Sequence, residues 1–78
     1  MIHIKLIANY RDQLPPEAKN GVVELDVPDG TTVYDAISQF DIPLDDTSVI
    51  VLNGLTVDMS TLLKGGDMVT AFSAIAGG

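Results

Sequence analysis

The sequence has 78 residues, of which eleven are acidic and four are basic, and it contains no cysteine and one histidine. A chain of this length forms one domain with a single small core. The absence of cysteine excludes disulfides, thiolate metal sites and a cysteine nucleophile. A single histidine makes a Ser-His-Asp site or a multi-histidine metal site very hard to build. The side chains therefore offer little for catalysis.

The formal net charge of −7 indicates which partners the surface favours. Nucleic acid and anionic membranes are poor partners for an acidic surface, whereas a basic protein surface is a good one; the acidity also keeps a small protein soluble. No apolar run approaches the ~18 residues needed to cross a membrane. Residues 1–5 alternate between apolar and polar side chains and show no signal-peptide core. We expect a cytoplasmic protein that binds neither nucleic acid nor membrane.

The first part of the chain predicts two strands joined by an irregular loop. Residues 2–8 alternate, with Ile2, Ile4, Leu6 and Ala8 on one face. The Pro15-Pro16 pair excludes a regular helix through the middle of residues 9–21, and Asn20-Gly21 is a turn signal. Residues 22–27 form a second strand with Val23, Leu25 and Val27 facing inward.

One helix follows and is expected to cover the sheet. Thr32 is a good N-cap residue. The negative charge of Asp35 in the first turn interacts favourably with the helix dipole. The apolar side chains Val33, Ala36, Ile37 and Phe40 then recur at helical spacing and form one buried face. Pro43 stops the helix.

The remaining residues predict three further strands. Residues 49–52 are all apolar and should be largely buried, and Asn53-Gly54 is a strong hairpin signal that leads into a short return strand at 55–57. Residues 64–67 form a turn, and residues 68–72 form the last strand. In that strand Val69 and Ala71 should face the helix, so that Thr70 and Phe72 point away.

Together these elements predict an α+β fold in which a mixed sheet of four to five strands packs on one helix. The first and last strands would pair in parallel at the centre, as in a ubiquitin-like β-grasp. We expect residues 1–73 to form this domain and residues 74–78 to form a flexible tail. The predicted core consists of Ile4, Leu6, Val23, Leu25, Ile37, Phe40, Val51, Leu63 and Val69.

The sequence ends on Gly77-Gly78. Glycine has no Cβ, so this end could be threaded through a narrow slot, and the carboxylate of Gly78 would be unshielded. Ile75 and Ala76 lead into it without adding charge. A frayed terminus explains the same residues equally well when they are considered alone.

Four motifs, taken in order, resemble the small sulfur-carrier proteins of the MoaD/ThiS type. They are the opening strand at residues 2–8, the Asp29-to-Val33 turn into the helix, the Val51-to-Gly54 hairpin, and the Leu63-to-Val69 segment followed by a strand and Gly-Gly. The resemblance implies that a ubiquitin-activating-type adenylyltransferase uses ATP to adenylate Gly78, which a persulfide donor then converts to a thiocarboxylate. In the molybdopterin branch this protein would be the non-catalytic small subunit, which donates sulfur to a precursor in the large subunit of molybdopterin synthase. No cofactor or metal would be bound by the chain itself.

The resemblance leaves alternatives for the pathway and for the class of function. Ser73-Ala74 stands where many molybdopterin small subunits carry a proline pair, so a less stiff tail is expected. Sulfur transfer in thiamine synthesis is the second choice of pathway, because that branch usually lacks a loop like residues 12–21. A sulfur carrier for another pathway is a further alternative. A ubiquitin-like protein modifier and an interaction module with an inert tail are the other classes. For partner contact the candidates are Phe72, as an exposed aromatic beside the tail, with Thr70 and Lys64.

Overall fold

The computed structural model describes residues 1–40, 42, 44 and 46–74. Five strands, one 3-10 helix and one short α-helix make up this part of the chain. Their bounds are β1 (Ile2–Leu6), η1 (Ala8–Gln13), β2 (Val22–Leu25), α1 (Val33–Ile37), β3 (Ser48–Leu52), β4 (Leu55–Val57) and β5 (Met68–Ser73). None of the helices in these residues is long and apolar enough to cross a membrane.

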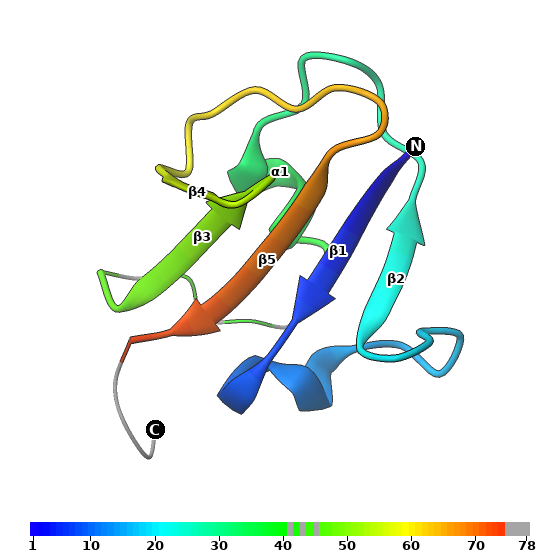
Figure 1. Ribbon diagram of the computed structural model, residues 1–78, viewed down its shortest axis with the longest axis vertical. Coiled ribbons are helices and arrows are strands. Elements are labelled where there is room, and N and C mark those ends of the chain that lie inside the picture. The colour runs from blue at the N-terminus through cyan, green and yellow to red at the C-terminus, as the bar shows by residue number, and fades with distance from the viewer. Residues whose placement is uncertain (41, 43, 45, 75–78) are drawn as a thin grey trace.

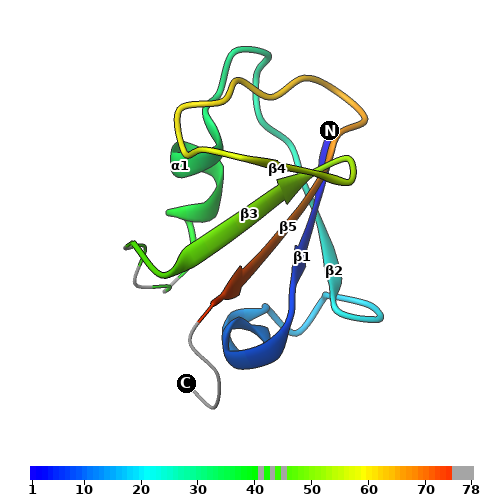
Figure 2. The same ribbon diagram turned by 60° about the vertical axis from the view of Figure 1, so that its left-hand side comes forward.

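The strands form one sheet in the order β2-β1-β5-β3-β4. The first and last strands, β1 and β5, lie in parallel at its centre, and the other neighbours are antiparallel. Figure 1 views the sheet from one side, with α1 behind it. The turned view in Figure 2 shows α1 on that rear face of the sheet. The α+β arrangement predicted from the sequence, a mixed sheet on one helix, is confirmed.

The core lies between α1 and the sheet. Most of the predicted core residues are buried there, and Leu25 and Phe40 pack against its margin as half-buried side chains. The buried members of the predicted set are Ile4, Leu6, Val23, Ile37, Leu63 and Val69. Ile50 and Ala71 complete the inward rows of β3 and β5.

The prediction that Val51 belongs to the core is wrong. The turn at Asn53-Gly54 places Leu52 opposite Leu55, and the neighbouring strand places Val51 beside Thr70. Because side chains alternate along a strand, Ile50 then faces α1 with 1% exposure and Val51 lies half-buried on the other side of the sheet. The uninterrupted apolar run hides this alternation in the sequence.

The helix is also shorter than its apolar spacing suggests. Thr32 is the N-cap, and its Oγ1 accepts a hydrogen bond from the Asp35 backbone N–H at 3.1 Å, as predicted. The α-helix ends at Ile37, and the Phe40 N–H donates to the Ile37 carbonyl at 3.0 Å in a tighter turn. Phe40 thus reaches the edge of the core from outside the helix.

The segment after β1 folds as η1, which the sequence did not predict. Ala8 begins it with a φ of +53° and is exposed, so its predicted place on the inward face of the strand is wrong. Tyr10 packs this segment onto the domain: it is 4% exposed and its hydroxyl lies 2.7 Å from Ser48 Oγ.

A group of hydrogen bonds joins the β3–β4 hairpin to the residues before β5. Asn53 has a φ of +51°, and its side chain donates to Asp67 Oδ1 at 3.0 Å and accepts from the Met68 N–H at 2.9 Å. The Lys64 N–H donates to Asp67 Oδ2 at 2.9 Å. These bonds from Asn53 and Lys64 hold the pKa of the Asp67 carboxyl below its ordinary value. The buried Asp67 therefore fixes where β5 begins relative to β3.

Two valines on neighbouring strands test the assignment of the sheet faces. Val69→Ala removes methyl groups from a side chain with 0% exposure, and we expect it to lower the free energy of unfolding by about 2–4 kcal/mol. Val51→Ala is the matched control on the uncovered face and should cost about 1 kcal/mol or less. Urea denaturation of both variants measures the difference, and equal losses would contradict the two-faced sheet.

Acid should weaken the Asp67 group. Because the folded-state pKa of Asp67 is lowered, its stabilisation is complete above the unfolded value of about 3.9 and is lost as the pH falls through the folded value. Asp67→Asn keeps only one acceptor and should lower stability at pH 7 by about 1–3 kcal/mol. Its remaining stability should then fall less than that of the wild type between about pH 5 and pH 2.

The measurement for Asp67 is urea denaturation across that pH range. Asp12→Asn, at an exposed position on η1, is the control and should follow the wild-type curve. If Asp67→Asn loses stability in acid as steeply as the wild type, the hydrogen-bonded carboxylate is not the group responsible.

Candidate functional site

The face of the sheet opposite α1 is not covered by another element of the described chain. We call it the open face, and its side chains come from the outward positions of the central strands. It consists of His3, Lys5, Val49, Val51, Met68, Thr70 and Phe72. The strand register sets Lys5, Thr70 and Val51 side by side in one row, and Phe72 beside Val49 in the next. Apart from the exposed Lys5, these side chains are half-buried.

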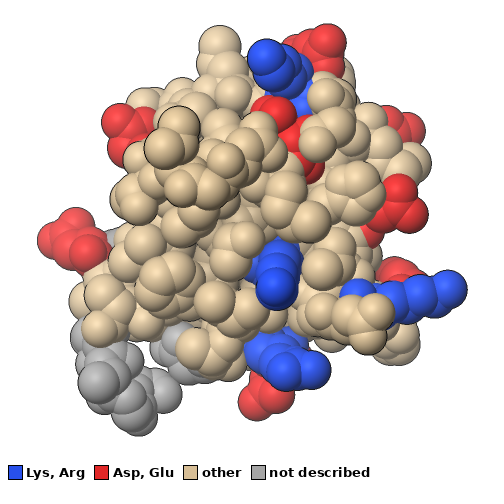
Figure 3. Space-filling view, in the orientation of Figure 1, with Lys and Arg blue, Asp and Glu red and all other residues tan. Residues whose placement is uncertain are grey.

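The open face differs in charge from the protein as a whole. Figure 3 views this face and shows uncharged side chains over most of it, with Lys and Arg groups among them and most Asp and Glu groups towards the rim. Lys5 lies within the face, although the chain carries a net charge of −7. The surface suits an apolar partner with a carboxylate near Lys5 better than the basic partner that the net charge alone indicates.

The structure brings two of the three predicted contact residues together. Thr70 and Phe72 lie on the outward side of β5, as predicted, while Val69 and Ala71 are buried. Phe72 is half-buried rather than fully exposed, because it lies against Val49 of the neighbouring strand. It lies outside the core and remains available at the surface.

Lys64 does not join them. It is exposed in the loop before β5, where the N–H of Gly66, two residues further on, donates to the Met1 carbonyl at 2.8 Å. Phe72 lies near the other end of β5, so the length of that strand separates the two residues (Figure 1).

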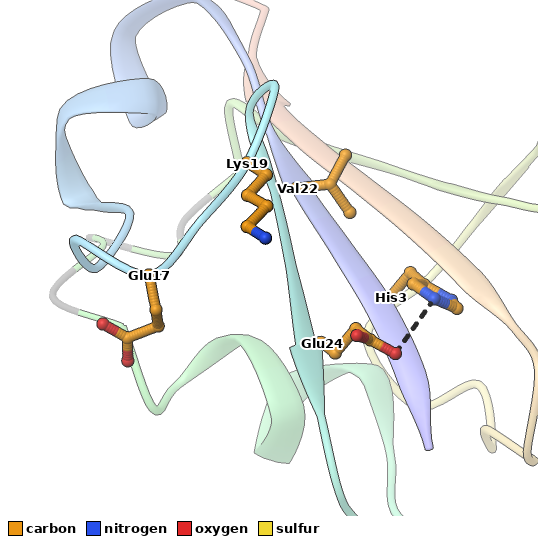
Figure 4. Close-up of a pocket in the computed structure, with 5 residues that line it drawn as sticks. All are labelled: His3, Glu17, Lys19, Val22 and Glu24. Atoms are coloured by element: carbon orange, nitrogen blue, oxygen red, sulfur yellow. Dashed lines mark ion pairs between the residues drawn. The ribbon is translucent and has the colours of Figure 1, made fainter.

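A hollow of about 310 Å³ borders the open face on its β2 side. His3, Glu17, Lys19, Val22 and Glu24 line it, and Figure 4 shows His3 and Glu24 turned towards each other across neighbouring strands. His3 Nε2 and Glu24 Oε2 are 3.5 Å apart, an ion pair when the imidazole is protonated. An exposed pair of this kind contributes little to stability. The lining mixes both signs of charge, which agrees with a surface role for His3.

The C-terminal segment leaves the sheet from its centre. Ser73 ends β5, and the Ala74 N–H donates to the Thr47 carbonyl at 2.7 Å. The predicted tail residues Ile75, Ala76, Gly77 and Gly78 lie outside the described residues. The strand that supplies Thr70 and Phe72 to the open face, β5, therefore also leads into this segment.

The sequence did not identify the contribution of β3 to this site. Val49 and Val51 were assigned to a buried strand, yet the pairing with β5 places them beside Phe72 and Thr70. The Asn53-Gly54 turn could have revealed this contribution. It fixes the register of the hairpin, and the register decides which face of the sheet each side chain of residues 49–52 occupies. Thr47 was not assigned a role from the sequence.

Within residues 1–40, 42, 44 and 46–74, no group of three histidine or acidic side chains is placed to hold a metal ion. Asp58, whose pKa is lowered by hydrogen bonds from the Ser60 hydroxyl and N–H, lies in an exposed turn after β4. The uncharged open face is therefore the feature of the described residues that is best suited to contact with another molecule.

Comparisons with known proteins agree with this architecture. A model of the family described as Mut7-C ubiquitin matches residues 1–76. The crystal structure of SAMP1 from Haloferax volcanii superposes with a TM-score of 0.73 at 23% sequence identity, covering 99% of this chain and 98% of that one. A comparison with curated protein sequences gives no match. The fold is a ubiquitin-like β-grasp of the MoaD/ThiS type.

Proposed function

Because this chain belongs to the Mut7-C ubiquitin family, we propose that it is a sulfur carrier that works through the carboxylate of Gly78. The observation that carries the proposal is the course of β5. This central strand presents Thr70 and Phe72 on the open face and then runs directly into the segment that holds Gly77 and Gly78. A partner docked on the open face would lie beside that segment.

The chemistry would take place on the main chain. A ubiquitin-activating-type adenylyltransferase would join the Gly78 carboxylate to the AMP part of ATP and release pyrophosphate. A persulfide sulfur would then attack the acyl carbon and displace AMP, and a thiol would reduce the resulting S–S bond to leave the thiocarboxylate. This route suits a chain with no cysteine, since the sulfur is carried without a thiol side chain. Glycine at the last positions admits the end to a narrow site that excludes water.

The acceptor that we favour is the large subunit of a molybdopterin synthase. The chain would be the non-catalytic small subunit that donates sulfur for molybdenum or tungsten cofactor synthesis. The resemblance of the motifs in chain order supports this choice, and the long segment between β1 and β2 favours it over the thiamine branch. Sulfur transfer in thiamine synthesis or another pathway is the alternative acceptor reaction.

A protein modifier would share the activation step, so the products must be separated by experiment. The intact mass of the protein isolated from native cells distinguishes the classes. A carrier shows replacement of oxygen by sulfur on the free chain, a modifier shows covalent adducts on lysines of other proteins, and an inert module shows neither. The same spectrum reports whether Gly78 is the last residue of the mature protein.

Deleting Gly78 should abolish adenylation. The deletion draws the carboxylate back by about 3.3–3.6 Å, out of line with the reacting phosphate. Gly77→Val should have a similar effect, because a branched Cβ enters the narrowest part of the partner's slot. For both variants, adenylation is measured by ATP–pyrophosphate exchange with the activating enzyme, and thiocarboxylate formation is then measured by mass. Residues added after Gly78 should block the reaction until a protease removes them.

The control for these variants is Gly65→Val. Gly65 is exposed, and an added Cβ would meet nothing nearer than the Met1 nitrogen at 3.9 Å, so adenylation should be unchanged. If the chain lacking Gly78 is adenylated and sulfurated like the intact chain, the proposed function is wrong.

Phe72 should be an anchor for the activating enzyme. Phe72→Ala removes an aromatic ring from the open face, and we expect binding to weaken by at least about 1 kcal/mol. Tyr34→Ala is the matched control, because Tyr34 is 52% exposed on α1, behind the sheet. Calorimetric titration measures the affinities and thermal unfolding checks the fold. Equal weakening by both variants would contradict docking through the open face.

A further inference from the structure

The first residues after β5 are held by Thr47, and we propose that Thr47 positions the C-terminal segment for adenylation. The Ala74 N–H donates to the Thr47 carbonyl at 2.7 Å, and the Ser73 hydroxyl donates to Thr47 Oγ1 at 3.3 Å. We call these two contacts the Thr47 latch. The inference rests on the proposed function, since it concerns how Gly78 reaches the activating enzyme.

The latch extends the sheet beyond its last strand. Ser48 and Ser73 are register partners at the end of the β3–β5 pairing. The bond between Thr47 and Ala74 adds one more antiparallel step, so the chain is still directed by the sheet at Ala74. Thr47 and Ser73 are half-buried, which limits competition from water for the bond between their hydroxyls, while Ala74 is exposed.

Nearby contacts hold Thr47 itself in place. The next residue, Ser48, has its Oγ 2.7 Å from the hydroxyl of Tyr10, and Tyr10 is 4% exposed. The anchor of the latch is therefore attached to η1 and to the core as well as to β3. A hydrogen bond to such a fixed point restricts Ala74 more than a bond to a free loop would.

This restriction replaces one that the sequence lacks. Ser73-Ala74 contains no proline, so the sequence predicts a less stiff segment at these positions. The structure instead gives both residues hydrogen bonds to Thr47. The start of the segment is thus fixed by contacts with Thr47, the residue before β3, rather than by its own covalent structure.

The latch sets the reach and direction of the chain end. From Ala74 to Gly78 the chain can extend at most about 13–14 Å. If the latch opened back to Phe72, the same end could reach about 20–21 Å and would sample many more directions. A closed latch leaves fewer orientations to be lost when the carboxylate meets ATP, so Thr47 is a positioning residue for adenylation.

Hydrogen exchange of the free protein tests the latch without any partner. The Ala74 amide should exchange at least about 10-fold more slowly than an unstructured amide of the same local sequence. Exchange at the unstructured rate overturns the proposal, whatever the activity of the protein.

Kinetics then test what the latch does. Thr47→Val removes the hydroxyl and keeps the shape, and it should lower kcat of adenylation about 3- to 10-fold with KM changed less than about 2-fold, because docking through the open face is intact. Thr47→Ser restores the hydroxyl and should recover kcat. Thr31→Val is the matched control: its hydroxyl donates to the Pro28 carbonyl at 2.7 Å in the turn before α1 and should not matter for adenylation.

The main-chain bond requires a chemical substitution. In a synthetic chain, an ester in place of the Ser73–Ala74 amide removes the donor to Thr47 and leaves every side chain in place. We expect kcat to fall about 10-fold or more. An ester at Gly66 removes a bond of similar length, 2.8 Å to the Met1 carbonyl, from the far end of the sheet and should leave kcat unchanged.

The outcomes separate this inference from the proposed function. If the intact chain is adenylated and the Ser73–Ala74 ester keeps its kcat, the latch has no positioning role while the carrier function stands. If no activating enzyme adenylates the intact chain, the proposed function fails, and the positioning role of Thr47 fails with it. Protection of the Ala74 amide would then show a held segment that serves another purpose.

Discussion

The parallel pairing of β1 with β5 is the constraint on which the rest of the molecule depends. It places the last strand at the centre of the sheet, with β1 on one side and β3 on the other. The backbone of a central strand is hydrogen-bonded to a neighbour on each edge. Its register therefore fixes which of its side chains face the core and which face the other side of the sheet. Val69 and Ala71 enter the core, and Thr70 and Phe72 must then occupy the open face. The start of the C-terminal segment is placed by the same pairing.

The strands could be predicted from the sequence where their side chains alternate or where a turn marks their end. Residues 2–6 and 68–73 alternate, and Asn53-Gly54 requires the left-handed backbone found there. The predictions failed where the order of apolar and polar residues showed no regular period. The run at 49–52 is apolar at every position, so only its pairing with β5 shows that Val51 faces outward. Likewise, Pro15-Pro16 gave no indication that η1 would precede it.

The candidate site was predictable to the extent that it lies on one strand. Thr70 and Phe72 follow from the alternation of β5, and Gly77 and Gly78 are visible in the sequence. Contacts between strands were not predictable: Val49 beside Phe72, and Thr47 beside Ala74, depend on the register of β3 against β5. Lys64, the third candidate for partner contact, precedes β5 and therefore lies at the other end of that strand from Phe72.

The distribution of charge and the position of β5 together suggest how binding and reaction are divided. Most of the carboxylates seen in the view of the open face lie towards its rim, where solvent screens them and they act mainly on the rate of encounter (Figure 3). The uncharged middle of the face, with Lys5 in it, can be desolvated at lower cost and can supply the energy of docking. In the proposed function the reacting group is a main-chain carboxylate, so no residue of the folded domain needs to be reactive. The domain then contributes orientation: the open face holds the partner, and the Thr47 latch directs the segment that enters it.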